Sequence, residues 1–162
     1  MISSGRLFDQ SSNRKSLNYK LSSFNFISME YLKNRNHDLE ACARRVIGEY
    51  RAAGRPLRIA DVVRETIESP APHFYLTYDY AIREVRRYRR NPESFEGKSM
   101  RKAQIREIVG HIDRIKQASK GRLSDDDALT RVLASTKASR FFISEAYAVK
   151  IIRKLFFRKI RN

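Results

Sequence analysis

The chain has 162 residues, of which 34 are Lys or Arg and 18 are Asp or Glu, so its formal net charge is +16. Such an excess opposes compaction unless a polyanion or salt screens it, and it predicts an anionic partner, most commonly nucleic acid. The single cysteine, Cys42, excludes an internal disulfide framework and a cysteine-based zinc site. No apolar run approaches the roughly 18 residues of a membrane span, and the N-terminus lacks a secretory signal. We therefore expect a soluble, cytoplasmic protein with no membrane partner.

Residues 1–28 differ in composition from the rest of the chain. They are rich in Ser and Asn, contain four basic residues and one acid, and show no sustained apolar period. This composition is typical of a disordered tail and also resembles an organellar transit peptide. The helical pattern begins just after Met29. We predict that residues 1–28 are either a disordered tail or a non-native extension. In the second case Met29 is the true start of the protein.

Three helices are predicted between residues 29 and 96, which we call copy one. Asp38 can cap the first helix and Gly54 can end it, with Leu39, Cys42, Val46, Tyr50 and Ala53 on its apolar face. A shorter helix starts near Asp61 and stops before Pro70 and Pro72. An extended stretch then carries Phe74 into the core, and Thr77 caps a third helix with Ile82 and Val85 on its inner face.

The same order of elements recurs between residues 97 and 162, which we call copy two. Its first helix carries a stripe of Ile105, Ile108, Ile112 and Ile115 and ends near Gly121. Ser124 is a suitable cap for the second helix, and Asp125, Asp126 and Asp127 suit its positive end. Phe141 and Ser144 stand where Phe74 and Thr77 stand in copy one, ahead of a third helix with Val149, Ile152 and Phe156 on its inner face.

The two copies align as an internal repeat with one slip. The separation is 66 residues before the loop and 67 after it, matching Leu57 with Leu123, Ile67 with Leu133, Phe74 with Phe141, Leu76 with Ile143, and Tyr80-Ala81 with Tyr147-Ala148. We predict an all-α fold of two tandem three-helix modules of helix-turn-helix-like but variant geometry. The geometry is variant because the link from Ser69 to Leu76 exceeds the three or four residues of a standard helix-turn-helix.

Basic residues are concentrated in copy two and on the third helices. Residues 29–98 have a net charge of +3 and residues 99–162 one of +10. Helical spacing places the basic residues on one face of each third helix, and Arg can bridge phosphates or read guanine edges. The predicted nucleic-acid-binding residues are Arg83, Arg86, Arg87 and Arg90 in copy one and Lys150, Arg153, Lys154, Arg158 and Arg161 in copy two.

Several interpretations of these faces remain open. We favour DNA binding, which would suit a regulatory role, over RNA binding, which the same charges would serve. A helical adaptor could instead dock an acidic protein through Leu155, Phe156 and Phe157. A charged helix face can also be only a solvated one. Tyr75, Tyr78 and Tyr80 could stack on bases or pack in the core.

No group of residues typical of an enzyme stands out in the sequence. His37, His73 and His111 are scattered, and Asp125, Asp126 and Asp127 lack the alternating ligands and glycine of a calcium loop. No phosphate-binding loop or nucleophile elbow occurs. We expect neither enzymatic activity nor a metal or other cofactor.

Three phrases carry a resemblance to a protein family. They are MEYLKNRNHDL, SPAPHFYLTYDYA and STKASRFFISEAYA, and the last two are corresponding parts of the two copies. The chain resembles small, uncharacterised basic proteins of Bacteroidales with tandem SPAP-F-Y/W-x-S motifs over about residues 29–160. The resemblance implies a start at Met29 and implies no activity. The second phrase lacks both prolines, so we expect its loop to differ.

Overall fold

The computed structural model describes residues 34–157, except for the side chain of Phe157. The elements are a first helix over residues 34–52, α2 (Ile59–Glu68), α3 (Tyr78–Arg90), the short 3-10 helix η1 (Pro92–Phe95), α4 (Ser99–Ala118), α5 (Asp125–Ser135) and α6 (Glu145–Phe157). The predicted all-α fold is confirmed for this part of the chain. The predictions for residues 1–28 and Met29 lie outside it. None of the described helices is long and apolar enough to cross a membrane.

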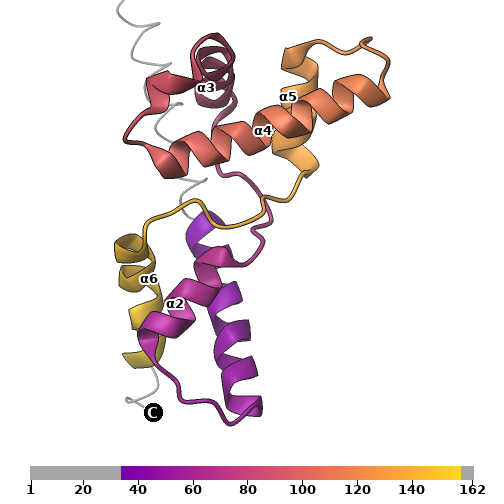
Figure 1. Cartoon of the computed structure of the whole chain (residues 1–162). Coiled ribbons are helices and arrows are strands. Elements are labelled where there is room, and N and C mark those ends of the chain that lie inside the picture. The colour runs from indigo at the N-terminus through magenta and orange to yellow at the C-terminus, as the bar shows by residue number, and fades with distance from the viewer. Residues whose placement is uncertain (1–33, 158–162) are drawn as a thin grey trace, which may run out of the picture.

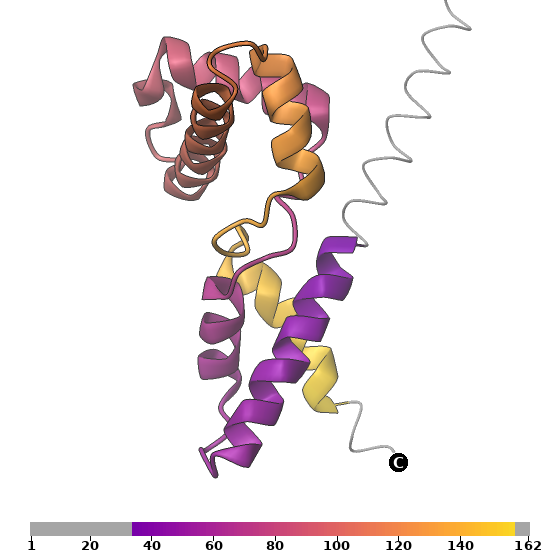
Figure 2. The ribbon, with the colours of Figure 1, turned by 90° about the vertical axis from the view of Figure 1, so that its right-hand side faces the viewer.

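The helices pack into two lobes (Figure 1). Lobe A contains the first helix, α2 and α6, and α6 packs along α2. Figure 2 shows the first helix beside both of them. Lobe B contains α3, η1, α4 and α5, and its three α-helices all contact one another. Lobe B is therefore one continuous stretch of chain, whereas lobe A is assembled from two stretches that are distant in sequence.

The lobes group the helices differently from the two sequence copies. The third helix of copy one, α3, packs on α4 and α5 of copy two, and the third helix of copy two, α6, packs on α2 of copy one. Two self-contained modules over residues 29–96 and 97–162 are therefore not confirmed. The links of residues 69–77 and 136–144 explain the arrangement, because each crosses from one lobe to the other (Figure 1). Each link has nine residues, longer than the three- or four-residue turn of a standard helix-turn-helix.

These two crossing segments are held together where they meet. Ala71 and Ala138 form an antiparallel bridge, with N–O distances of 3.0 and 2.9 Å. Phe74 stacks on Phe142 at 6.5 Å between ring centroids, and Tyr75 stacks on Phe141 at 6.2 Å. Phe74 and Phe141 are both buried, as the sequence predicts. The second segment therefore pairs with the first although it lacks the two prolines.

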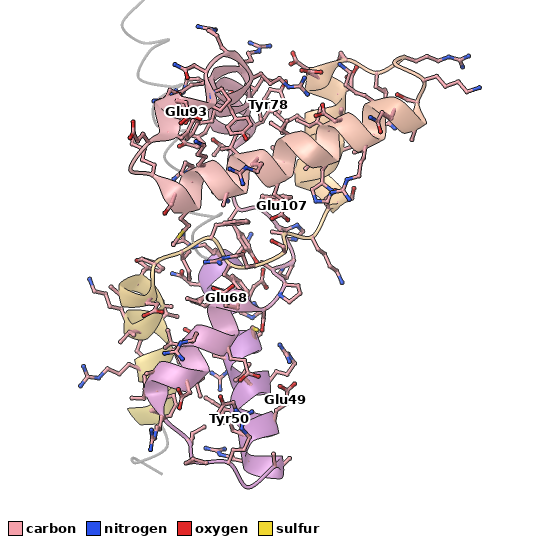
Figure 3. The ribbon with its side chains drawn as sticks, in the orientation of Figure 1. Glu49, Tyr50, Glu68, Tyr78, Glu93 and Glu107 are labelled. Carbon is pink, nitrogen blue, oxygen red and sulfur yellow. The ribbon has the colours of Figure 1, made fainter. Side chains whose placement is uncertain are left out.

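Acidic side chains from both lobes fix the second crossing segment. Arg140 forms an ion pair with Glu68 of α2, at 3.0 Å. The backbone N–H and the hydroxyl of Ser139 donate to Glu107 of α4, at 2.7 and 2.5 Å. Figure 3 shows Glu68 and Glu107 on opposite sides of the crossing. The junction is thus tied to lobe A and lobe B by separate contacts.

Matched positions of the two copies make matched contacts in the two lobes. In lobe B, the guanidinium of Arg101 lies 4.7 Å from the ring centroid of Tyr80. In lobe A, Arg35 lies 4.6 Å from the ring centroid of Tyr147. Arg35 and Arg101 are 66 residues apart and the tyrosines 67, the separations found in the sequence alignment. In each case the partner belongs to the other copy.

One triplet of positions distinguishes the two lobes chemically. In lobe B, Arg89 of α3 pairs with Asp113 of α4 at 2.5 Å and with Asp125 of α5 at 3.5 Å. The corresponding positions in lobe A are Phe156, Ile47 and Ile59, which all belong to the hydrophobic core or pack against it. Packing within each copy would instead place Arg89 beside two isoleucines and Phe156 beside two aspartates. The exchanged packing avoids both mismatches.

The helix ends follow the predicted capping chemistry with one exception. Thr77 and Ser144 accept the N–H groups of Tyr80 and Tyr147, and Ser124 accepts that of Asp127. Asp38 is not a cap, because the helix already includes residues 34–37. Its carboxylate instead accepts the hydroxyl of Tyr75 at 2.7 Å.

Candidate nucleic-acid interface

α3 presents a basic outer face because its apolar residues are fixed inside lobe B. Ala81, Ile82 and Val85 are buried, and on the opposite side Arg83, Arg86 and Arg90 are exposed. Thr77 fixes the start of the helix. A cationic helix surface of this kind can lie along a phosphate backbone or enter a groove.

Acidic neighbours reduce the positive charge of the α3 face. Arg86 pairs with Asp126 of α5 at 3.2 Å. Glu84 is buried on α3, with Arg83 Nε at 3.6 Å from one carboxylate oxygen and Arg87 at 3.9 Å from the other. An exposed ion pair contributes only about 0–1 kcal/mol. A phosphate can therefore compete for Arg86 at little cost to the fold.

Arg87 has a structural role in lobe B. Its Nε donates to the hydroxyl of Ser94 at 2.9 Å, and a second nitrogen donates to the Ser94 carbonyl at 2.6 Å. The guanidinium also lies 4.8 Å from the ring centroid of the buried Phe95. Three contacts thus hold Arg87 against η1, unlike the exposed Arg83 and Arg90.

α6 presents the corresponding face of lobe A. Ala148 and Ile152 are buried in the core, while Lys150, Arg153 and Lys154 are exposed. Arg158 and Arg161, which continue the predicted face, lie outside the described residues.

Two basic residues of lobe B, Arg89 and Lys116, pair with acids although no local sequence pattern singles them out. Arg89 falls between the helical positions that define the predicted face, and its two acidic partners could be identified only once α3 was placed on α4 and α5. Lys116 of α4 also pairs with Asp125, at 2.5 Å. This hydrogen bond, together with the charges of Arg89 and Arg86, lowers the pKa of the Asp125 carboxyl. The acidic start of α5 thus neutralises neighbouring cations in addition to favouring its own helix end.

Two of the three tyrosines considered for base stacking have partners within the protein. The Tyr75 ring is stacked on Phe141 and its hydroxyl is bonded to Asp38, and burial and this bond both raise the Tyr75 pKa. Tyr80 lies under Arg101. Tyr78 is 37% exposed and is labelled in Figure 3. Core packing therefore accounts for Tyr75, whereas Tyr80 lies between the guanidinium groups of Arg83 and Arg101.

The apolar end of α6 is largely covered. Leu155 and Phe156 are partly buried and pack against the hydrophobic core, and the side chain of Phe157 lies outside the described residues. An adaptor surface would require these residues to form an exposed patch. The described contacts of Leu155 and Phe156 favour core packing instead.

The three histidines do not combine into a metal site in the part of the chain that the structure describes, and no cluster of three or more His, Cys, Asp or Glu residues suited to a metal occurs there. His111 is partly buried against the edge of Phe74, at 5.9 Å between ring centroids. Burial and the charge of Arg114 lower its pKa.

No protein-family model matches the chain, and no curated protein or solved structure matches it either.

Proposed function

We propose that this protein is a tandem repeat with exchanged third helices that binds nucleic acid, DNA in preference to RNA, through the outer faces of α3 and α6. A regulatory role would follow if binding is sequence-specific. One observation carries the proposal: each lobe buries the apolar side of one third helix and leaves its Arg- and Lys-rich side exposed. Such a side matches the charge of a phosphate backbone.

We assign the larger contribution to α6 of lobe A, because residues 99–162, which include this helix, have a net charge of +10, whereas residues 29–98 have one of +3. Its described residues include Lys150, Arg153 and Lys154 against one acid, Glu145. On α3, Arg86 is paired with Asp126, and Arg87 is held by Ser94. A polyanion must displace the first of these contacts before it can use Arg86. Arg90, which is exposed and forms no ion pair with a described residue, is the α3 residue that we expect to contact phosphate directly. Arg83 must first leave Glu84, with which it is paired at 3.6 Å.

The proposal predicts a strong salt dependence of DNA binding. Each phosphate neutralised by a basic side chain contributes about 0.9 to the slope of log affinity against log salt. We expect K150A/R153A/K154A to lower this slope by about 2 to 3 units. The measurement is a fluorescence-anisotropy titration of nuclease-treated protein with duplex DNA at several salt concentrations.

A matched control removes three exposed arginines elsewhere on lobe A. Arg51, Arg58 and Arg64 form no ion pair with any described residue. We expect R51A/R58A/R64A to retain most of the slope although it loses the same net charge. Equal losses in the two variants, or binding that does not change with salt, would contradict an interface on α6.

Competition between nucleic acids tests the preference for DNA. A-form RNA has a narrow major groove that excludes a helix, and single strands offer unstacked bases. We expect duplex DNA to displace bound duplex DNA at lower concentrations than duplex RNA or single strands do. The opposite order would identify an RNA-binding protein that uses the same charges.

A further inference from the structure

A basic hollow lies at the outer end of lobe B, away from the third-helix faces. It has a volume of about 380 Å³ and is lined by Ala118, Ser119, Lys120, Arg122, Leu123 and Arg131. The turn between α4 and α5 supplies two of the cations and α5 supplies the third. Figure 3 shows nitrogen-tipped side chains extending from this turn.

The local backbone brings these cations together. Lys120 and Gly121 both adopt left-handed conformations, with φ of 53° and 74°. The Gly121 N–H returns to the Lys116 carbonyl at 2.8 Å, and that of Arg122 returns to Ser119 at 3.2 Å. The chain therefore reverses within a few residues, which places Lys120 and Arg122 beside Arg131.

The charge of the hollow is not balanced by its neighbours. Lys120, Arg122 and Arg131 are exposed, and none forms an ion pair with a described residue. Of the three acids at the start of α5, Asp125 pairs with Lys116 and Asp126 pairs with Arg86, while Asp127, one turn before Arg131, accepts the hydroxyl of Ser124 at 2.7 Å. Like charges gathered without a counter-ion repel one another, and an anion would relieve the repulsion.

Lobe A shows that the fold does not require this cluster. The positions of Lys120, Arg122 and Arg131 correspond to Gly54, Pro56 and Glu65 in copy one. The turn in lobe A still forms, with Gly54 at φ 62°. The three cations are therefore an addition that distinguishes lobe B from lobe A.

We propose that the hollow formed by Lys120, Arg122 and Arg131 binds a phosphate group of a nucleic-acid backbone. This inference rests on the proposed function and adds a phosphate contact outside α3 and α6. Arg can hold phosphate oxygens through two N–H groups, and Lys supplies a point charge. The contact would fix the orientation of the protein on the duplex without reading sequence.

The first test uses the full chain, labelled with ¹⁵N, and inorganic phosphate as the probe. We expect saturable shifts of the amide signals of residues 119–122 on adding phosphate, relative to chloride at equal ionic strength. The shifts should disappear in K120A/R122A/R131A. Absence of saturable shifts in the unmodified chain would overturn the assignment.

The second test measures the DNA affinity of the same variant over a range of salt concentrations. Loss of one phosphate contact should lower the salt slope by about 1 unit. The single substitution R131E, which introduces the acid found in lobe A, should weaken DNA binding at low salt without changing the thermal melting profile. R51A/R58A/R64A again controls for net charge.

The two tests separate this inference from the proposed function. Phosphate shifts without any DNA binding would refute the proposed function and, with it, a nucleic-acid backbone as the ligand. Phosphate shifts with DNA affinity unchanged in K120A/R122A/R131A would overturn backbone phosphate as the occupant and identify a site for free phosphate. If the protein binds DNA but shows neither phosphate shifts nor a lower salt slope in K120A/R122A/R131A, the hollow is not a phosphate site. The interface would then consist of α3 and α6.

Discussion

Gln104 shows how a single buried polar residue supports the junction between the lobes. It lies on α4 and is 6% exposed, and its Nε2 donates to the Phe74 carbonyl at 2.8 Å. Q104A would leave that carbonyl without this bond, and leaving a buried polar group unsatisfied costs about 1–3 kcal/mol. We expect the free energy of unfolding, measured by urea denaturation, to fall by this amount.

Gln117 offers a control on the same helix, because it is exposed. Q117A should change the unfolding free energy by less than about 0.5 kcal/mol. Equal effects of the two substitutions would show that the Gln104–Phe74 bond does not stabilise the junction.

His111 makes stability depend on pH in a defined direction. Its folded-state pKa is lowered, chiefly by burial and then by Arg114. The unfolded chain therefore binds the proton more readily than the folded one, and stability falls as the pH drops below about 6.5, the ordinary histidine pKa. We expect H111Q to weaken this loss in thermal melts recorded between about pH 5 and pH 7.

His37 provides the comparison, because its side chain is 84% exposed. H37Q should retain the pH dependence of the unmodified chain. If H37Q removed the pH dependence of stability and H111Q did not, the burial of His111 would not be the cause of that dependence.

At the scale of the element, the third helices begin with equivalent caps in separate lobes. Thr77 and Ser144 each accept a backbone N–H, at 3.4 and 3.3 Å. Replacing such a residue by Ala costs about 1 kcal/mol. We expect T77A and S144A each to lower the unfolding free energy by this amount in chemical denaturation.

The double variant tests whether the two caps act independently. Distant sites without shared partners add to within about 0.5 kcal/mol, so T77A/S144A should cost about 2 kcal/mol. If T77A/S144A lowered the unfolding free energy no further than either single substitution, the two caps would not act independently. S135A, at the far end of α5, serves as a control.

Local sequence patterns predicted the helices and their capping residues well. Thr77, Ser124 and Ser144 are caps whose chemistry depends only on neighbours two or three residues away. Asp38 is not a cap because the helix extends further toward the N-terminus than the apolar pattern predicts, and its partner Tyr75 is distant in sequence. The structural roles of Arg87 and Arg89 could not be predicted from local patterns, because their partners become neighbours only after η1 forms and α3 docks on α4 and α5.

At the scale of the whole molecule, the choice of helix partners is the feature that the sequence left undetermined. Both third helices have an apolar inner face, and either could cover either pair of first and second helices. Three positions favour the observed partners over the alternative ones. In lobe B they are charged, Arg89, Asp113 and Asp125, and in lobe A they are apolar, Phe156, Ile47 and Ile59. This difference can be identified in the sequence only after residues 29–96 and 97–162 are aligned and both pairings of the helices are compared.

Removing α6 tests the exchange directly. Truncation after residue 144 should unfold residues 34–68, which lose their packing partner, while residues 78–135 remain folded. Hydrogen exchange should then show rapid exchange in the first region and protection in the second. Truncation after residue 157 is the control, and it should preserve both regions.

Packing within each copy makes the opposite prediction for the same truncation. Loss of α6 would then expose α4 and α5 and leave residues 34–90 protected. Protection of residues 34–68 in the chain truncated after residue 144 would therefore refute the exchange.

The continuity of lobe B has a consequence for how the protein forms during synthesis. Domains generally fold as units, beginning with the N-terminal one, while the chain is translated. Here the first helix and α2 emerge first but must wait for α6, so their apolar residues, including Val62 and Ile67, stay uncovered while lobe B is being made. Lobe B lies in the sequence between α2 and α6, so it can complete its core before α6 is synthesised. The N-terminal helices would thus be the last to reach their native packing and the most dependent on chaperone protection.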